Sequence, residues 1–523
     1  MHLLKSFKEA LKNPYLQAAS LLIICFAAFL FLHYAPFLSD PDSFYHIKIS
    51  QMISDGKIVQ DFPYLQASIL KNNFVDHHLL YHAYLAPFVK YLSPVWGAKI
   101  GHLFLSCLVF LAVFVFLKKI KAKYAWLLTM SMFLSWAFIF RMMLIKAQPL
   151  SLMLIILSLY FLIKKKHIPL LITGFVFVWA YGGWFLLLIL ALAYIFIKAI
   201  DQTIAKNLQS FDRLKDFFKN IFDWGNAWIF LAPFAGLALG LIINPYFPKN
   251  LYFYYVQIIQ IGFIHNKLIS VGSEWYQFSA RDLFTNIAIP LIILALPIIF
   301  NFAYFKKIDL KSKFLLFVSL LFLLATVKSK RNIEYFVPLA VLAAGSTFQS
   351  ALSDQKIKSD WDLVLAKIKN IISFKLMGSL IILLFAFSMA LNLINLQQKS
   401  KLIDINSMAG ASFWIKNNAK GQTIYNLRWD RFPMLFYQNS DNNYVAGLDP
   451  TFTYAYGHQL LQKYQDIYRG KIDDQTAGII KNDFKSDYII ADMIDKKFLT
   501  AIKGYPQFEV VYQDQEAIIY KIK

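Results

Sequence analysis

The sequence predicts a mostly α-helical, polytopic membrane protein with about 11 transmembrane helices and a C-terminal mixed α/β domain. Of its 523 residues, 58% are hydrophobic and only 16% are charged, whereas soluble domains carry about 25% charged residues. The apolar residues gather in stretches of about 17 to 25, the length at which a helix crosses the hydrocarbon layer. This pattern stops near residue 397, where mixed polar sequence begins. A fully soluble fold is therefore excluded.

The first transmembrane helix is expected over residues 16–37. This apolar run follows Lys5, Lys8 and Lys12 and is too long for the apolar region of a signal peptide. We therefore predict an uncleaved helix whose N-terminal end is cytoplasmic. Further spans are predicted at residues 98–117, 124–140, 149–163, 168–181, 184–198, 227–243, 286–304, 314–327, 333–352 and 375–396.

Basic islands between the spans set their orientation, since Lys and Arg gather on the cytoplasmic side. With a cytoplasmic N-terminus, this face receives the islands at residues 118–123, 164–166, 198–219, 306–313 and 356–375. Residues 1–396 then form the transmembrane domain, and its long loops 38–97 and 244–285 face outward together with a C-terminal domain over 397–523. The formal net charge of +22 is thus explained by contact with membrane lipids, and nucleic acid is excluded as a partner.

The C-terminal segment alternates short apolar patterns with turn signals such as Gly421 and the run 439–443. These patterns predict strands at residues 423–427, 444–446, 488–491 and 508–512, and an amphipathic helix at 459–468. The domain is therefore expected to be mixed α/β. The whole chain shows no internal repeat, so the inverted-repeat architecture of many transporters has no support.

Two acids, Asp40 and Asp42, lie where the first helix leaves the bilayer. Paired carboxylates repel one another, and they persist most readily where a cation or a substrate proton lies between them. The alternative is a structural role, because Asp42 could simply cap the helix that follows.

A histidine cluster follows in the same loop. His78 and His82 are four residues apart and would share a helical face, where they could bind a divalent metal or hold a lipid phosphate. The alternative is that they are hydrogen-bonded structural residues. In the second long loop, Glu274 stands among aromatic residues. It is either a base or ligand with a cation nearby, or a solvated acid in an interfacial aromatic belt.

Cations at two outer turns violate the expected charge asymmetry. Lys330 and Arg331 lie in the turn between the ninth and tenth helices, and Arg141 and Lys146 lie after the third. Such cations at an outer interface would pair well with a phosphate or pyrophosphate, and Arg adds a bidentate fork. The alternative is internal neutralisation of the first turn by Glu334.

The run Asp42-Ser43-Phe44-Tyr45-His46-Ile47-Lys48 resembles the first acidic motif of archaeal and eukaryotic oligosaccharyltransferase catalytic subunits. The order of the motifs and the layout of the chain are similar as well. By this resemblance, Glu274 corresponds to a metal-coordinating Glu and Arg331 to an arginine that faces the lipid diphosphate. Trp429 and Asp430 match the centre of the family's acceptor-recognition motif WWDYG, with Arg428 in place of its first Trp.

The resemblance implies a GT-C glycosyltransferase of the prokaryotic plasma membrane. Such an enzyme would transfer a sugar or glycan from a polyprenyl-phosphate-linked donor to a glycan, lipid or protein acceptor at the outer face. Asp42, assisted by Asp40 or Glu274, would act on the acceptor, and the cations would hold the phosphate. Two alternatives remain, which are N-glycosylation of protein asparagine and transport or flipping of a lipid-linked glycan.

The resemblance leaves the cofactor open. The family's second acidic motif should follow the third helix, where residues 141–148 contain no carboxylate. Either the reaction proceeds without a divalent ion, or a different ligand set binds Mg²⁺ or Mn²⁺. The candidate ligands for that metal are Asp42, His78, His82 and Glu274.

Overall fold

The structure is a computed structural model that describes residues 13–206, 210–264, 272–371, 374–399 and 403–523. Lys5, Lys8 and Lys12, from which the cytoplasmic position of the N-terminal end is predicted, lie outside these ranges. Each predicted span coincides with a helix or with a bent helical pair. The spans are α2 (Pro14–His33), α6 (Pro94–Lys119), α7–η1–α8 (Ala125–Met130, Ser131–Leu134, Trp136–Met143), α9 (Gln148–Ile163), α10 (His167–Ala180), α11 (Leu186–Ala205), α13 (Trp224–Ile242), α15 (Ala280–Ala303), α16 (Leu310–Lys328), α17 (Ile333–Ser353) and α19 (Phe374–Lys399).

The lengths and apolar character of these helices make the chain a multi-pass membrane protein. Among the described residues, seven helices are long and apolar enough to cross a bilayer, and an eighth span is formed if α7–η1 and α8, bent by 86°, are taken together. Shorter apolar helices are α9, α10 and the 382–398 part of α19. The predicted span 124–140 is therefore broken, and α8 runs in a different direction from α7.

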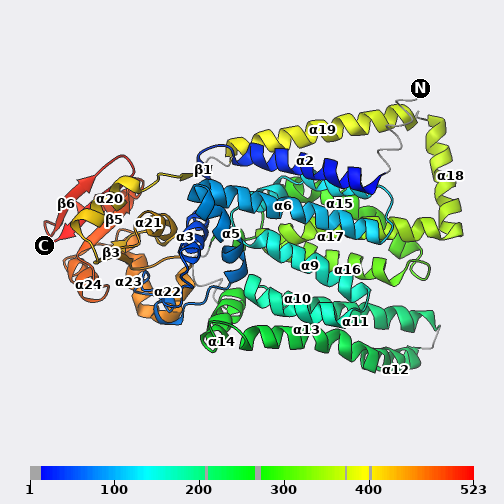
Figure 1. Cartoon of the computed structure of the whole chain (residues 1–523), viewed down its shortest axis with the longest axis horizontal. Helices are drawn as coiled ribbons and strands as arrows, with labels where there is room; N and C mark the ends of the chain where they lie inside the picture. Colours follow the sequence, from blue (N-terminus) through cyan, green and yellow to red (C-terminus); the bar gives the residue numbers. More distant parts are fainter. Residues whose placement is uncertain (1–12, 207–209, 265–271, 372–373, 400–402) are drawn as a thin grey trace.

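The helices run back and forth, so the connecting segments gather at two opposite ends (Figure 1). One end carries α3 (Asp42–Ser54), α4 (Leu70–Asn73), α5 (Leu79–Tyr91), α14 (Lys249–Tyr254) and the C-terminal domain. The other end carries α12 (Ser210–Ile221) and α18 (Gln355–Ile371), which belong to the basic islands. This separation is the one that the alternation of islands and long loops predicts.

Small residues allow two of the spans to pack closely. A Cβ added at Gly236 on α13 would lie 2.0 Å from the carbonyl oxygen of Leu171 on α10, and one at Gly174 would lie 2.8 Å from that of Pro233. Only glycine fits at such distances, as is common at helix contacts within membranes. This packing holds α10 beside α13 and so fixes the position of the loop that follows Ala180.

The C-terminal domain is a five-stranded mixed sheet flanked by helices. The strand order is β4-β3-β5-β7-β6, in which β3 is parallel to both β4 and β5, and β7 is antiparallel to β5 and β6. Its strands are β3 (Thr423–Asn426), β4 (Asn443–Tyr444), β5 (Tyr488–Asp492), β6 (Phe508–Gln513) and β7 (Ala517–Ile522). Its helices are α20 (Ala409–Asn418), α21 (Phe432–Gln438), α22 (Pro450–Tyr456), α23 (His458–Tyr468), α24 (Thr476–Asn482) and α25 (Lys496–Ile502). The predicted mixed α/β class is confirmed.

Backbone pairing fastens this domain to the first long loop. The Tyr444 amide donates to the carbonyl oxygen of Tyr64 at 2.8 Å, and the Gln66 amide donates to that of Tyr444 at 2.8 Å. The loop therefore covers β4, which would otherwise be an open sheet edge. A second pairing joins β1 (Phe37–Leu38), directly after α2, to β2 (Ile403–Asp404), directly after α19. These contacts hold the domain over the end of the bundle.

Candidate functional site

A cavity of about 410 Å³ lies where the membrane helices, the two long loops and the C-terminal domain meet. This volume is within the range of small-molecule sites, about 300 to 1,000 Å³. Tyr181, Phe253, Trp275 and Tyr335 are among the aromatic residues of its wall. The charged side chains of the wall are Asp42, Lys146, Glu274, Lys328, Arg331 and Asp449. The cavity therefore combines acids and cations with a largely apolar lining.

Asp40 and Asp42 share a single cation. Asp42 is the first residue of α3, whereas Lys146 lies in the short turn between α8 and α9. The Lys146 ammonium donates to Oδ2 of Asp42 at 2.8 Å and lies 3.0 Å from Oδ2 of Asp40. Asp40 also accepts a hydrogen bond from the Asp42 backbone amide at 2.8 Å. The cation expected between these paired acids is thus a side chain of the same chain.

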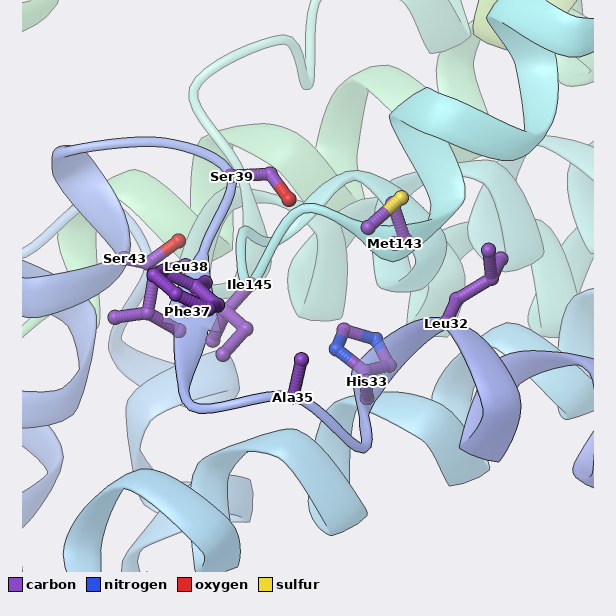
Figure 2. Close-up of a pocket in the computed structure, with 9 residues that line it drawn as sticks. All are labelled: Leu32, His33, Ala35, Phe37, Leu38, Ser39, Ser43, Met143 and Ile145. Atoms are coloured by element: carbon purple, nitrogen blue, oxygen red, sulfur yellow. The ribbon is translucent and has the colours of Figure 1, made fainter. Parts of the chain in front are cut away.

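The loop before α3 is held in place by packing and by a buried lysine. The ammonium of Lys99 donates to the backbone carbonyls of His33 and Ala35, at 3.1 and 2.6 Å. Figure 2 shows the small cavity beneath this loop, about 10 Å³ in volume and walled by residues that include His33, Ser39 and Met143. Such a space holds one water molecule at most. It is not a substrate site, and the tight packing fixes the loop that leads to Asp40.

A second ion-pair cluster lies behind the cavity. The buried Arg141 guanidinium donates from Nε to Glu334 at 2.7 Å and from Nη1 to Glu274. Glu274 itself is a wall residue, whereas Arg141 and Glu334 stand behind it. Glu334 forms its ion pair with Arg141, from a different turn, while the charges of Glu334 and Glu274 also raise the pKa of Arg331, so internal neutralisation of the outer turn stays an alternative. Breaking a buried pair leaves an uncompensated charge, so this cluster acts as a rigid support for Glu274.

Arg331 presents its guanidinium to the cavity. Its Cζ lies 4.3 Å from the centre of the Trp275 ring, its Nη2 donates to the Tyr181 hydroxyl at 2.8 Å, and its Nη1 lies 4.0 Å from Glu274. Stacking and one hydrogen bond hold the planar group without using its whole fork of donors. Arg331 can therefore bind an anion that enters the cavity.

The histidines form a buried chain beside the cavity. Both oxygens of Asp76 lie within 2.9 Å of His82 Nδ1, and His82 Nε2 lies 2.7 Å from His46 Nδ1. Among the histidines that the structure describes, His46, His77 and His78 reach the cavity wall. His82 is fully buried and bonded to Asp76 and His46, which agrees with the structural alternative, and the metal role of His78 and His82 stays a prediction. Over the described ranges, no three His, Cys, Asp or Glu side chains are grouped to hold a metal ion.

Burial and neighbouring charges shift the pKa values of Asp40, Glu274 and Lys146 in opposite directions. Burial raises the pKa of Asp40 to about 6, against the lowering effect of Lys146. Burial would also raise the pKa of Glu274, but Arg141, Lys146 and Arg331 hold it well below its usual range. The Lys146 pKa is raised, because Asp40 and Asp42 outweigh the effect of burial. At neutral pH, Glu274 and Lys146 are therefore charged.

The structure brings most of the predicted residues together at the cavity or directly behind it, namely Asp40, Asp42, Arg141, Lys146, Glu274 and Arg331. It does not do so for Lys330, Trp429 and Asp430. Lys330 lies over the Phe278 ring at 5.8 Å and is absent from the described cavity wall, in which Lys328 stands instead. Neither Trp429 nor Asp430 contributes to that wall, and Asp430 is paired with Arg428 at 3.0 Å.

One acidic wall residue was not predicted. Asp449 precedes α22 and caps it, since its carboxylate accepts from the Thr451 amide at 2.8 Å. Burial raises its pKa to about 6. The pattern Asp449-Pro450-Thr451 is a helix-start signal in the sequence, but only the docking of the C-terminal domain places it at the cavity. Phe452, in the helix that Asp449 caps, packs against Phe253, with ring centres 5.8 Å apart.

The chain matches no family model and no curated protein sequence. Similar solved structures do exist. The archaeal oligosaccharyltransferase AglB from Archaeoglobus fulgidus, in complex with an inhibitory peptide and a dolichol-phosphate, matches 97% of this chain and 74% of its own, with a TM-score of 0.63 and 11% identity. ArnT from Cupriavidus metallidurans matches 96% of both chains with a TM-score of 0.53 and 12% identity.

A third match is the arabinofuranosyltransferase AftD from Mycobacteria, over 97% of this chain and 40% of that one, with a TM-score of 0.54 and 10% identity. All three neighbours are GT-C glycosyltransferases. At this level of identity, the matches establish the fold. The predicted architecture of membrane helices with a C-terminal mixed α/β domain is confirmed.

Proposed function

We propose that this protein is an integral-membrane glycosyltransferase that transfers a sugar or glycan from a polyprenyl-phosphate-linked donor to an acceptor at the extracytoplasmic face of a prokaryotic plasma membrane. The observation that carries the proposal is the cavity at the end of the bundle, in which Asp42, Lys146 and Arg331 face one another within a GT-C fold. A donor anchored in the bilayer by its prenyl chain can place its phosphate there without leaving the membrane.

The cations of the cavity wall can stabilise the negative charge of the departing phosphate. Cleavage of the bond between the sugar and the phosphate places negative charge on the phosphate oxygens, and donors already in place stabilise that charge. Arg331 offers a planar fork that is preorganised by Trp275 and Tyr181. Lys146 and Lys328 add point charges on the same wall.

Asp42 is the residue that would orient or deprotonate the acceptor. Its carboxylate lies on the wall, with Oδ2 fixed by Lys146, and a carboxylate within hydrogen-bond reach can orient or deprotonate a nucleophile. In the proposed reaction the acceptor gives up a proton, its nucleophilic atom bonds to the anomeric carbon, and the phosphate leaves with the electrons of the broken bond. Asp42 accepts or directs that proton, while Arg331 and Lys146 receive the charged phosphate.

Protein N-glycosylation is a second candidate, because AglB matches nearly the whole chain. Against it, Trp429 and Asp430, the proposed acceptor-recognition residues, stand away from the described cavity wall. A glycan or lipid acceptor requires no such motif. The two candidates differ in the linkage of the product, and a flippase would form no new linkage.

The test is mass spectrometry of cell-surface glycans from cells with the protein, without it, and with Asp42→Asn. The proposal expects a glycan that disappears on deletion and is not restored by Asp42→Asn, although this variant is inserted in the membrane in normal amount. Sugar on asparagine would favour the second candidate. Identical glycan profiles in all three strains would contradict the enzyme assignment.

A further inference from the structure

The most densely charged part of the site is built around the ammonium of Lys146. Asp40 and Asp42 contact it directly, at 3.0 and 2.8 Å. Glu274 is close enough to raise the Lys146 pKa as well. The lysine is buried, with about 7% of its surface exposed. Three carboxylates from two separate loops thus converge on one internal cation.

The fold suggests a divalent ion at this place, because the first acidic motif and Glu274 resemble metal-binding residues of oligosaccharyltransferases. The residues present do not fit one. Mg²⁺ requires near-octahedral oxygen ligands at about 2.0 to 2.1 Å, and Oδ2 of both Asp40 and Asp42 already faces Lys146 Nζ. Glu274 is likewise engaged by Arg141. The Lys146 ammonium therefore occupies the position between the two carboxylates that a divalent ion would take.

The local charges are already nearly balanced. The carboxylates of Asp40, Asp42, Glu274 and Glu334 face the cations of Lys146, Arg141 and Arg331. Four negative groups therefore meet three positive ones, so cations of the chain itself already neutralise most of the carboxylate charge. Each buried carboxylate has a cationic partner in the chain, which removes the electrostatic reason to bind a metal.

We infer that Lys146 is the resident cation of this site, taking the place of a divalent metal ion between Asp40 and Asp42 and donating to the phosphate of the donor. An ammonium has three donors, of which two face the carboxylates. The side chain also lies on the cavity wall, so the third donor is in position for a phosphate oxygen. This inference rests on the proposed function for the phosphate but not for the contacts with the carboxylates.

Metal binding provides a test that does not depend on activity. Binding of Mn²⁺ to the purified full-length protein in lipid nanodiscs is measured by electron paramagnetic resonance. The wild-type protein should show no Mn²⁺ site that depends on Asp42. Lys146→Ala frees the carboxylates and should create one site with a dissociation constant of about 10⁻⁴ to 10⁻³ M, the range of weak carboxylate sites. The double variant Lys146→Ala/Asp42→Asn should lose that site.

Lys99→Ala is the matched control. Lys99 is also a buried lysine, but the partners of its ammonium are the carbonyls of His33 and Ala35. Its removal exposes no carboxylate and should create no Mn²⁺ site. Lys146→Met, which keeps much of the side-chain volume without the charge, should behave as Lys146→Ala does and serves if the alanine variant fails to fold.

Transfer activity provides the second arm. The wild-type rate should change less than twofold when EDTA is added. Lys146→Ala should lose about 10²-fold without metal, as expected for the loss of a charge-stabilising donor, and recover at least tenfold with added Mn²⁺. If no variant or condition shows transfer, the proposed function fails and the binding arm still decides the role of Lys146.

Two results would overturn the inference. One is a stoichiometric Mn²⁺ site in the wild-type protein that disappears in Asp42→Asn. The other is a folded Lys146→Ala or Lys146→Met variant that gains no Mn²⁺ site.

Discussion

Replacing Arg331 tests the proposed phosphate site, because its guanidinium is the most preorganised cation of the wall. In Arg331→Ala, the phosphate loses a charge-assisted hydrogen bond, which is worth about 1.5 to 3 kcal/mol. This corresponds to a roughly 10- to 150-fold loss in donor use. Trp275 and Tyr181, which hold the group at 4.3 and 2.8 Å, keep their own positions. The loss should therefore appear in the interaction with the donor and leave folding largely intact.

The assay measures initial transfer rates at varied concentrations of a polyprenyl-phosphate-linked donor in nanodiscs. The KM for the donor should rise with the KM for the acceptor little changed. Arg331→Lys should restore only part of the loss, since an ammonium has no planar fork. Lys330→Ala is the matched control, because Lys330 lies over Phe278 rather than on the described cavity wall, and its effect should be below about threefold. An unchanged KM for the donor in Arg331→Ala, or equal losses in both alanine variants, would refute the reasoning.

Three further predictions follow from the ion pairs and the topology. Arg141→Ala should destabilise the fold by about 3 to 5 kcal/mol, because it leaves the buried Glu334 without its ion-pair partner and removes one cation from Glu274. Thermal unfolding would show this as a lowered Tm, and a normal Tm would contradict the supporting role. Because burial raises the pKa of Asp40 to about 6, Asp40 gains a proton as the pH falls through 6, and its pair with Lys146 weakens. Transfer should therefore decline on the acid side of pH 6. If the same decline persists in Asp40→Asn, it belongs to another group. Cysteines introduced at the exposed positions Asn72 and Asp441 should react with an impermeant thiol reagent in intact cells, whereas reaction only after lysis would reverse the predicted orientation.

The membrane part of the fold was predictable because its cause is local. A bilayer demands apolar runs of fixed length and an asymmetry of Lys and Arg, and both are visible in the sequence. The position of α8 was harder to predict from the sequence. The 86° bend before Trp136 interrupts an apolar run that the sequence shows as a single span, and Arg141 follows this bend, where it pairs with Glu274 and Glu334.

The partners within the site could not be predicted, because they join distant parts of the chain. Asp42 and Lys146 are 104 residues apart, and Arg141 and Glu334 are 193 residues apart. The sequence does show that paired acids require a cation and that outer-face cations require an anion. It does not show that these acids and cations pair with each other, as Asp42 does with Lys146 and Glu334 does with Arg141. Asp449 was missed for the same reason, since its local pattern indicates only a helix cap.

The most direct test of the central claim is whether the bond between sugar and phosphate is cleaved. The purified protein in nanodiscs is supplied with polyprenyl-phosphate-linked glycan extracted from its host, and both released polyprenyl phosphate and glycosylated acceptor are quantified by mass spectrometry. A glycosyltransferase should release polyprenyl phosphate in equal amount to the transferred glycan, and Asp42→Asn should abolish both products. Intact donor in the presence of every host acceptor fraction, with glycan merely moved across a vesicle membrane, would contradict the account.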